Sequence, residues 1–186
     1  MARAVFLDRD GVVVADADGA VPATLTPLQG VADALARLSA AGWRLVVVTN
    51  QTAIARGLLS EAQVAEQHEA LGLLLGGVID RFIVCPHHPD ADLEAYRGPC
   101  SCRKPGTGML RQAARELDVD LTASVMIGDR PTDIEAGAAA GCRTVLVKSG
   151  MHLRPRIIAP LPASPVRPDH VAPDLPAAAD WVLRRA

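Results

Sequence analysis

The chain has 186 residues, of which 49% are hydrophobic and only 3% aromatic, so we expect a sizeable core built mainly from Ala, Val and Leu. Its 19 Lys and Arg balance 21 Asp and Glu, which excludes the basic surface of a nucleic-acid-binding protein. Charges at Arg3, Asp8 and Asp10 exclude a signal peptide, and the longest uncharged apolar run, 70–79, is half of the about 20 residues that a membrane span needs. We therefore expect a cytoplasmic protein that uses clustered cysteines for metal binding rather than disulfides.

Short β-branched runs alternate with amphipathic helical segments along the chain. In chain order, the expected elements are strand 4–8, helix 26–42, strand 44–50, helix 60–75, strand 80–85, helix 106–120, strand 124–130, helix 132–141 and strand 143–150. Two of these helices begin with capping-box pairs, Ser60 with Gln63 and Thr132 with Glu135. Gly42 is expected to end the helix at 26–42.

The last part of the chain is expected to complete the sheet. Residues 151–168 hold five of the 14 prolines and are predicted to form an irregular loop, followed by a short edge strand and a closing helix. Fully apolar strands alternating with helices predict an α/β fold, a Rossmann-like parallel sheet with helices on both faces. The segments between the strands leave no room for a large cap domain, so we expect a single domain over residues 1–186.

Polar side chains follow the carboxyl ends of four expected strands. They are Asp8 and Asp10 at the first strand, Thr49 and Asn50 at the second, Asp129 at the fourth, and Lys104 in the loop after the third. Open parallel sheets bind ligands at this edge, so we expect these residues to form one site. Asp8 and Asp10 would repel each other unless a cation lay between them, and Mg²⁺ suits their oxygen ligands. A bound Mg²⁺ with Lys104 nearby would favour a phosphorylated substrate.

Each of these residues also has an ordinary structural interpretation. The Asp-Gly pair at 10–11 is typical of a turn, Thr49 has high strand propensity, and Lys104 is consistent with a solvated surface lysine. Asp129 and Asp133 are consistent with capping the helix at 132–141, and for Asp133 we favour capping.

Residues 85–105 contain three of the four cysteines. Cys85-x-His87 and Cys100-x-Cys102 make a Cys₃His set, which is complete for tetrahedral structural zinc and leaves no open position for catalysis. The alternative is a loop with incidental thiols. We expect a zinc loop at 85–104, inserted between a strand and a helix.

The expected metal would fix the backbone beside two cations, Arg103 and Lys104, and the loop would form one wall of the pocket. His88 is left as a surface residue, and the distant Cys142 is expected to be a small core residue.

Four motifs stand in order along the chain: FLDRDG (6–11), VVVTNQ (46–51), CRKP (102–105) and MIGDRPTD (126–133). Together they resemble the motifs of haloacid dehalogenase superfamily phosphatases. The CPHH…CSCRKP loop resembles the zinc-binding branch of that superfamily, which holds heptose-bisphosphate phosphatases and histidinol-phosphatase domains. The similarity covers residues 4–150. The sequence departs from the branch at Val14, where many relatives have Asn, and at Gly19-Ala20, where they have Gly-Tyr.

The resemblance implies a role for each motif residue. Asp8 is implied as the nucleophile that forms an aspartyl-phosphate, and Asp10 as the general acid and base. Thr49 and Lys104 are implied to hold the transferring phosphoryl group. The implied Mg²⁺ ligands are Asp8, the backbone carbonyl of Asp10, and Asp129. The implied substrate contacts are Asp16, Ala17, Asp18, Gly19, Asn50, Gln51, Thr52, Arg103 and Arg130.

Three functions follow as hypotheses. The first is a Mg²⁺-dependent phosphatase, carrying Zn²⁺ in its loop, that removes the 7-phosphate of D-glycero-D-manno-heptose 1,7-bisphosphate. The second is a phosphatase of histidinol phosphate or another small phosphate ester. The third is a non-catalytic zinc module that binds another macromolecule. For the enzyme, we expect a monomer whose partner is a small-molecule sugar bisphosphate, with no nucleic acid or membrane bound.

Overall fold

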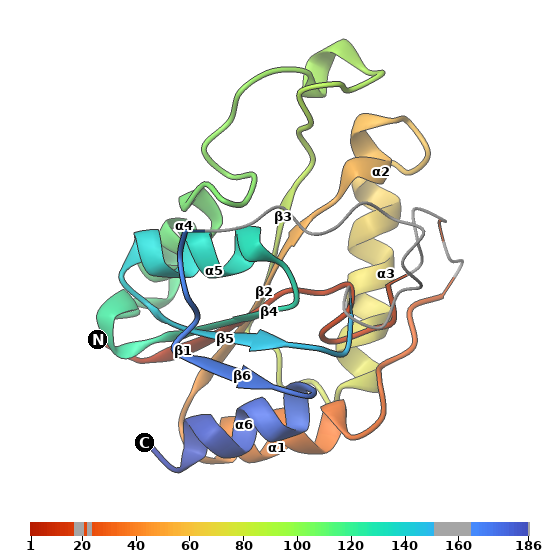
Figure 1. Ribbon diagram of the computed structural model, residues 1–186. Helices are drawn as coiled ribbons and strands as arrows, with labels where there is room; N and C mark the ends of the chain where they lie inside the picture. The colour runs from red at the N-terminus through yellow and green to blue at the C-terminus, as the bar shows by residue number, and fades with distance from the viewer. Residues whose placement is uncertain (17–20, 22–23, 151–164, 186) are drawn as a thin grey trace.

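The computed structural model describes residues 1–16, 21, 24–150 and 165–185. A six-stranded, wholly parallel sheet forms its centre, in the order β3-β2-β1-β4-β5-β6 (Figure 1). The strands are β1 (Ala4–Leu7), β2 (Arg44–Asn50), β3 (Arg81–Cys85), β4 (Val125–Gly128), β5 (Arg143–Val147) and β6 (His170–Ala172). The chain order reverses direction at β1, so the switch point of the topology lies between β1 and β4.

Helices cover both faces of the sheet, which confirms the predicted Rossmann-like α/β fold (Figure 1). Residues of α1 (Val31–Ala40), α3 (Glu61–Leu74) and α6 (Leu175–Leu183) pack on one face. Residues of α4 (Gly108–Leu117) and α5 (Pro131–Ala140) pack on the other. The short helix α2 (Thr52–Ala55) follows β2 directly.

The alternation of side chains along β1 explains its continuous apolar sequence. Val5 and Leu7 join the core beneath α1 and α6, whereas Ala4 and Phe6 join the core beneath α4 and α5. All four residues are fully buried. A strand that is covered on both faces has no position at which a polar side chain would reach water.

Helix ends and caps differ from the sequence expectations at several places. The helix expected from residue 26 begins at Val31, because Gly30 before it has a left-handed φ of 75°. The helix expected to reach residue 120 ends at Leu117, because Asp118 has a φ of 51°. The predicted Thr132–Glu135 capping box at α5 is wrong: Asp133 accepts the capping hydrogen bond from the Arg130 N–H at 3.0 Å. The Ser60–Gln63 box at α3 is confirmed.

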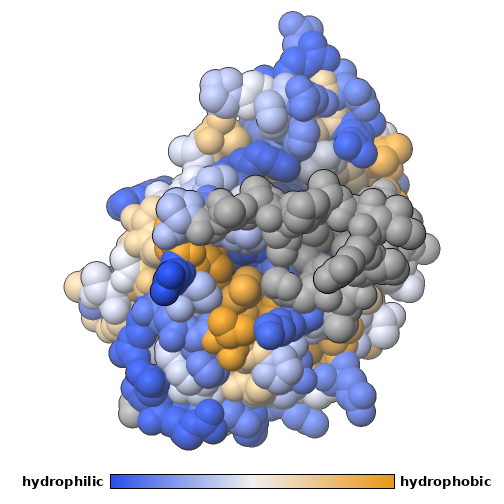
Figure 2. Space-filling view, viewed as in Figure 1, coloured by the Kyte–Doolittle hydropathy of each residue, from blue (hydrophilic) through white to orange (hydrophobic). Residues whose placement is uncertain are grey.

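The segment between β3 and α4 projects beyond the carboxyl ends of the strands (Figure 1). It contains one short 3-10 turn, η1 (Glu94–Tyr96), and its surface is largely hydrophilic on the side seen in Figure 2. A second 3-10 turn, η2 (Leu121–Ala123), precedes β4. The described residues contain no large cap domain, as expected.

Two further expectations concern the chain's periphery. Most of the proline-rich stretch predicted as a loop, residues 151–164, lies outside the described residues. Among the helices that are described, none combines the length and the apolar character that crossing a bilayer requires.

Candidate functional site

Asp8 and Lys104 meet at the carboxyl edge of the sheet. Asp8 directly follows β1, and its Oδ1 lies 2.8 Å from the Nζ of Lys104. The same Nζ lies 2.7 Å from Oδ1 of Asp133 and donates to the backbone carbonyl of Val48 at 2.9 Å. Only 4% of Lys104 is exposed, so its interpretation as a solvated surface lysine is wrong.

The end of β2 holds the backbone of Lys104 in place. The side-chain amide of Asn50 accepts from the Lys104 N–H at 3.1 Å and donates to the Lys104 carbonyl at 3.2 Å. Because one amide satisfies both backbone groups of the same residue, β2 fixes the position at which the projecting segment delivers its lysine. Asn50 was expected to contact substrate, and the structure shows its amide in contact with the backbone of Lys104.

Burial and the neighbouring charges shift the pKa values of Lys104 and Asp133. Burial would lower the pKa of Lys104, but Asp133 and Asp8 outweigh it and raise that pKa, so the amine stays protonated. Burial, and then the neighbouring Asp8, raise the pKa of Asp133 to about 6, against the opposing effect of Lys104. The result is a fixed ammonium group beside the buried carboxylate of Asp8.

Asp10 lies in a second hydrogen-bonded group next to the first. The Arg9 guanidinium contacts both carboxylate oxygens of Asp10 at 3.1 Å, and Nε2 of Gln51 donates to Oδ2 at 3.0 Å. The same Gln51 nitrogen donates to Thr49 Oγ1 at 2.7 Å. Burial raises the pKa of Asp10, and the nearby Asp8 adds to this, while Arg9 opposes it. A raised pKa favours the protonated acid that a general acid must be at the start of a reaction.

Three buried carboxylates gather where a cation would lie. Ligand oxygens of Asp8, Asp129 and Asp133 all lie within 4.8 Å of one another. Two glycine backbones close around Asp129, because a Cβ on Gly11 would approach its Oδ2 to 2.6 Å and one on Gly150 would overlap the same atom. These three carboxylates outnumber the two cations beside them, Lys104 and the Arg130 guanidinium, whose Nε lies 3.9 Å from Asp129 Oδ1. Oxygen ligands of this kind fit a hard cation such as Mg²⁺.

Cys85, His87, Cys100 and Cys102 also come together, with their ligand atoms within 4.8 Å of one another. The Cys85–Cys100 sulfur separation is 3.6 Å and that from Cys102 Sγ to His87 Nδ1 is 3.5 Å. Both match the edge of about 3.5–3.8 Å between ligands of tetrahedral zinc, whereas the Cys85–Cys102 sulfur separation of 2.9 Å is shorter. Burial raises the pKa of Cys85, so its thiolate form would need a cation as partner. The donor set fits zinc.

Cys142 and His88 lie outside this cluster of ligand atoms. Cys142 is 7% exposed and packs in the core beneath α4 and α5, as predicted. His88 is partly exposed and accepts from the Asp90 N–H at 3.0 Å.

Two arginines lie near the edge of the site. Arg103 donates from Nη1 to the His87 carbonyl at 2.9 Å, so the cysteine-rich segment holds its guanidinium. Arg130 pairs with Asp16 at 2.8 Å across 114 positions of sequence. Both were expected to contact substrate, as was Thr52, which begins α2. The remaining expected contacts, Ala17, Asp18 and Gly19, lie outside the described residues.

The sequence reasoning missed three residues that complete the arrangement. Asp133 was assigned to capping, yet its carboxylate caps α5 and also holds Lys104. Its spacing of four from Asp129, which brings both carboxylates to the start of one helix, is the signal that was available. Arg9 and His68 form a hydrogen bond of 3.1 Å behind Asp10. His68 continues the buried helical spacing of Val64 and Leu71, which is typical of a core position.

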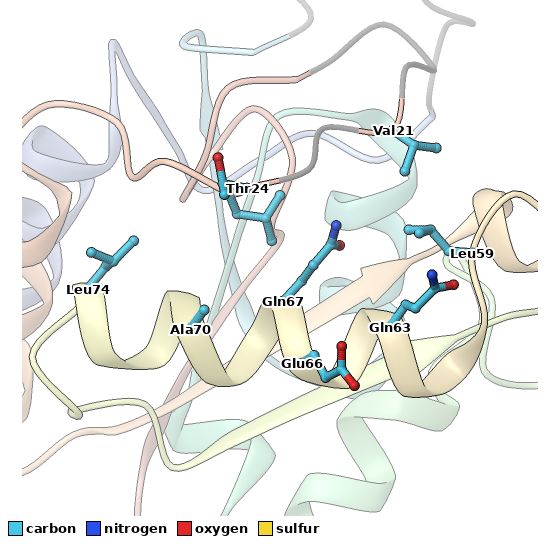
Figure 3. Close-up of a pocket in the computed structure, with 9 residues that line it drawn as sticks. Val21, Thr24, Leu59, Gln63, Glu66, Gln67, Ala70 and Leu74 are labelled. Carbon is cyan, nitrogen blue, oxygen red and sulfur yellow. The ribbon is translucent and has the colours of Figure 1, made fainter.

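A separate hollow of about 390 Å³ lies between α3 and the chain around Thr24 (Figure 3). Gln63, Ala70 and Leu74 line it from α3, and Leu59 lines it from the chain just before this helix. None of the candidate site residues that the structure describes contributes to its wall.

The chain is similar to proteins of known family over most of its length. The family model described as haloacid dehalogenase-like hydrolase matches residues 1–138, and a HAD-hydrolase-like model matches residues 101–178. The D-glycero-beta-D-manno-heptose-1,7-bisphosphate 7-phosphatase of Bordetella bronchiseptica is 39% identical over 189 residues, which cover 99% of each chain. The enzyme of the same name from Escherichia coli K12 is 39% identical over 97% of this chain and 87% of its own.

Two solved structures are also similar to this chain over nearly its whole length. The crystal structure of D,D-heptose 1,7-bisphosphate phosphatase from B. bronchiseptica, complexed with magnesium and phosphate, superposes with a TM-score of 0.80 at 36% identity, covering 99% of both chains. A HAD-like phosphatase from Mesorhizobium loti superposes with a TM-score of 0.77 at 31% identity, covering 97% of this chain and 87% of its own.

Proposed function

Because the chain belongs to the haloacid dehalogenase-like hydrolases, we propose that it is a Mg²⁺-dependent phosphatase that removes the 7-phosphate of D-glycero-D-manno-heptose 1,7-bisphosphate. The observation that carries the chemistry is the buried Asp8–Lys104 pair at the carboxyl edge of the sheet. The names of relatives that match nearly the whole chain support the substrate, and specifically its β anomer.

In the proposed reaction, a carboxylate oxygen of Asp8 attacks phosphorus and forms an aspartyl-phosphate while the bond to the sugar oxygen breaks. Lys104 holds the phosphoryl oxygens, and its contacts with Asp8 and Asp133 support this role. Thr49 supplies a hydroxyl from the carboxyl end of the neighbouring strand β2. Splitting hydrolysis into two displacements makes each one easier than direct attack by water.

Asp10 moves the proton in both steps. It donates a proton to the departing sugar oxygen, and the resulting carboxylate then takes a proton from the water that attacks the aspartyl-phosphate. This water releases inorganic phosphate and restores Asp8 and the protonated Asp10. The raised pKa of Asp10 supports its role as the initial acid.

We further propose that Asp8, the Asp10 backbone carbonyl and Asp129 hold Mg²⁺, and that the Cys₃His cluster holds Zn²⁺. When bound, Mg²⁺ supplies positive charge that offsets the charge developing on the phosphoryl oxygens. Zinc would fix residues 85–104 as one wall of the pocket, and Arg103 and Arg130 would then face the second phosphate or the sugar.

We propose that residues 1–186 form one domain and act as a cytoplasmic monomer. The absence of a disulfide among the four cysteines, all of which lie in the described chain, supports a reducing compartment.

A phosphate-release screen tests the function. The purified protein with Mg²⁺ should release phosphate from heptose 1,7-bisphosphate with a higher kcat/KM than from histidinol phosphate or sugar monophosphates. Asp8→Asn should abolish release while retaining substrate binding, because an amide of the same shape is a poor nucleophile. Asp90→Asn, which removes an exposed carboxylate, should behave like the unchanged protein. Preference for histidinol phosphate, or no release at all, would contradict the proposal.

A further inference from the structure

A buried pair of side chains lies behind Asp10 and has no part in the chemistry described above. We propose that Arg9 and His68 are positioning residues that hold the Asp10 carboxyl group in the orientation for proton transfer to the leaving group. The inference rests on the proposed function, since it assigns these two residues to the acid of that reaction.

Arg9 is an unusual residue to find buried. Only 6% of its side chain is exposed, although arginine is rarely buried without partners. Its Nη2 contacts both Asp10 oxygens at 3.1 Å, and its Nε lies 3.3 Å from Oδ1. A planar guanidinium that contacts both oxygens restricts rotation of the carboxyl group more than a single hydrogen bond would.

His68 occupies the opposite end of the guanidinium. Its Nε2 lies 3.1 Å from Arg9 Nη1, and because arginine has only donors, Nε2 must accept and the proton of the ring must be on Nδ1. Only 4% of His68 is exposed, and its ring stacks on Phe82 with centroids 4.7 Å apart and planes at 17°. Burial, followed by the charge of Arg9, lowers the pKa of His68 to about 4, which keeps the ring neutral at pH 7.

The order of contacts therefore runs from helix α3 through His68 and Arg9 to Asp10. Arg9 is anchored on both sides, by Asp10 towards the site and by a rigid ring towards the core. Gln51, which lies between β2 and α2, adds a hydrogen bond to Asp10, so the acid is held from two separate parts of the chain. A residue that acts in this way affects the rate through orientation, and small misplacements of catalytic groups are costly.

The test separates orientation of the acid from general stability by means of the leaving group. A sugar alkoxide needs a proton to depart, whereas p-nitrophenolate is a weak base that departs without one. His68→Phe keeps an aromatic ring against Phe82 but removes the acceptor. We expect it to lower kcat/KM for heptose 1,7-bisphosphate about tenfold and for p-nitrophenyl phosphate less than about twofold. His68→Gln, whose amide oxygen can accept from Arg9, should recover most of the loss.

His170→Phe is the matched control, because it also replaces an imidazole stacked on an aromatic ring, that of Trp181 at 5.1 Å, at the amino end of β6. It should leave both substrates unaffected. Equal losses on both substrates for His68→Phe, or no loss on either, would overturn the inference. If the unchanged protein releases no phosphate from either substrate, the proposed function fails instead.

A second measurement does not depend on activity. Nitrogen NMR of the histidine side chains at pH 7 should show His68 neutral, with its proton on Nδ1. A ring that is charged, or that carries its proton on Nε2, would also overturn the inference.

Discussion

At the scale of single residues, the site depends on side chains that are buried with their partners. Lys104 and Arg9 are both cations in the interior, and each contacts a carboxylate that the proposed reaction uses. A buried charge without its partner is strongly destabilising, so both pairs are fixed features of the folded state. Substitutions of residues that contact Lys104 or Arg9 should therefore change particular steps of the proposed reaction, in addition to any effect on the free energy of unfolding.

Arg103 is expected to determine the preference for bisphosphates. One phosphate reacts at Asp8, and the guanidinium, which the His87 carbonyl holds, can bind the other at two points. Arg103→Ala should lower kcat/KM for a sugar bisphosphate by about tenfold or more but that for a monophosphate by much less. Arg111→Ala removes an exposed arginine from α4 and serves as the charge control. Parallel losses on both substrates would remove Arg103 from this role.

His68 should make the free energy of unfolding depend on pH. Its pKa is about 4 in the folded protein against an ordinary value of 6.5, so the unfolded chain binds more protons between these values. The contribution of His68 to the free energy of unfolding is therefore fully present above about pH 6.5. It is lost as the pH falls towards 4, by up to about 3 kcal/mol. Urea unfolding at pH 7 and pH 5 should show a smaller pH effect in His68→Gln than in the unchanged protein. The His170→Phe variant should keep the full effect, and an unaltered pH effect in His68→Gln would contradict the assignment.

At the scale of elements, the segment between β3 and α4 is joined to the rest of the molecule at several points. Tyr96 donates to Glu61 on α3 at 2.6 Å, and the Leu93 N–H donates to the Ala55 carbonyl of α2 at 3.0 Å. Asn50 clamps Lys104 from the end of β2. The segment is thus positioned by three other elements in addition to any metal that its cysteines bind.

Two variants separate the effect of the Asn50–Lys104 hydrogen bonds from the effect of the bound metal. Asn50→Ala should lower kcat about tenfold while zinc remains bound, because it frees the Lys104 backbone but leaves the Cys₃His cluster intact. Cys102→Ser should lose zinc and lower kcat by about 10²-fold, because a displacement of about 1 Å can cost that much. Metal analysis, circular dichroism and phosphate release, measured on each variant, check both expectations. A zinc-free Cys102→Ser protein with full activity would show that the cluster does not position Lys104.

At the scale of the whole molecule, the fold brings two chemically different donor sets to one edge of the sheet. The carboxylates of Asp8 and Asp129 follow β1 and β4, while the Cys₃His cluster lies beyond β3. Carboxylates favour Mg²⁺ and thiolates favour Zn²⁺, so the two metals should be held independently.

Chelation should therefore act in two stages. Brief treatment with EDTA should abolish phosphate release and leave zinc in the protein, because thiolate sites hold zinc tightly whereas Mg²⁺ exchanges readily. Excess Mg²⁺ should restore full activity. Metal analysis beside the assay checks both stages, and recovery that requires added Zn²⁺ would contradict the separation of the two sites.

The amino-acid sequence by itself determined the sheet and most of the site's members. Continuous apolar runs specified the buried strands, since a strand covered on both faces tolerates no polar residue in its middle. The polar residues at the strand ends indicated which side chains would gather, because all strands of a parallel sheet end at the same edge. The two-residue spacing of Cys85 with His87, and of Cys100 with Cys102, was sufficient to predict their cluster. These are local signals, which neighbouring residues carry together.

Only the tertiary structure decided how those residues are paired. Lys104 meets Val48 across 56 positions of sequence, and Arg9 meets His68 across 59. In the sequence, Asp133 was interpreted as a helix cap, which is correct for its local segment, whereas His68, a buried residue of α3, was not singled out. Their second contacts arise because α3, α5 and the segment after β3 pack against the same end of the sheet. Contacts of this kind depend on the packing of whole elements, which the spacing of residues within one segment does not specify.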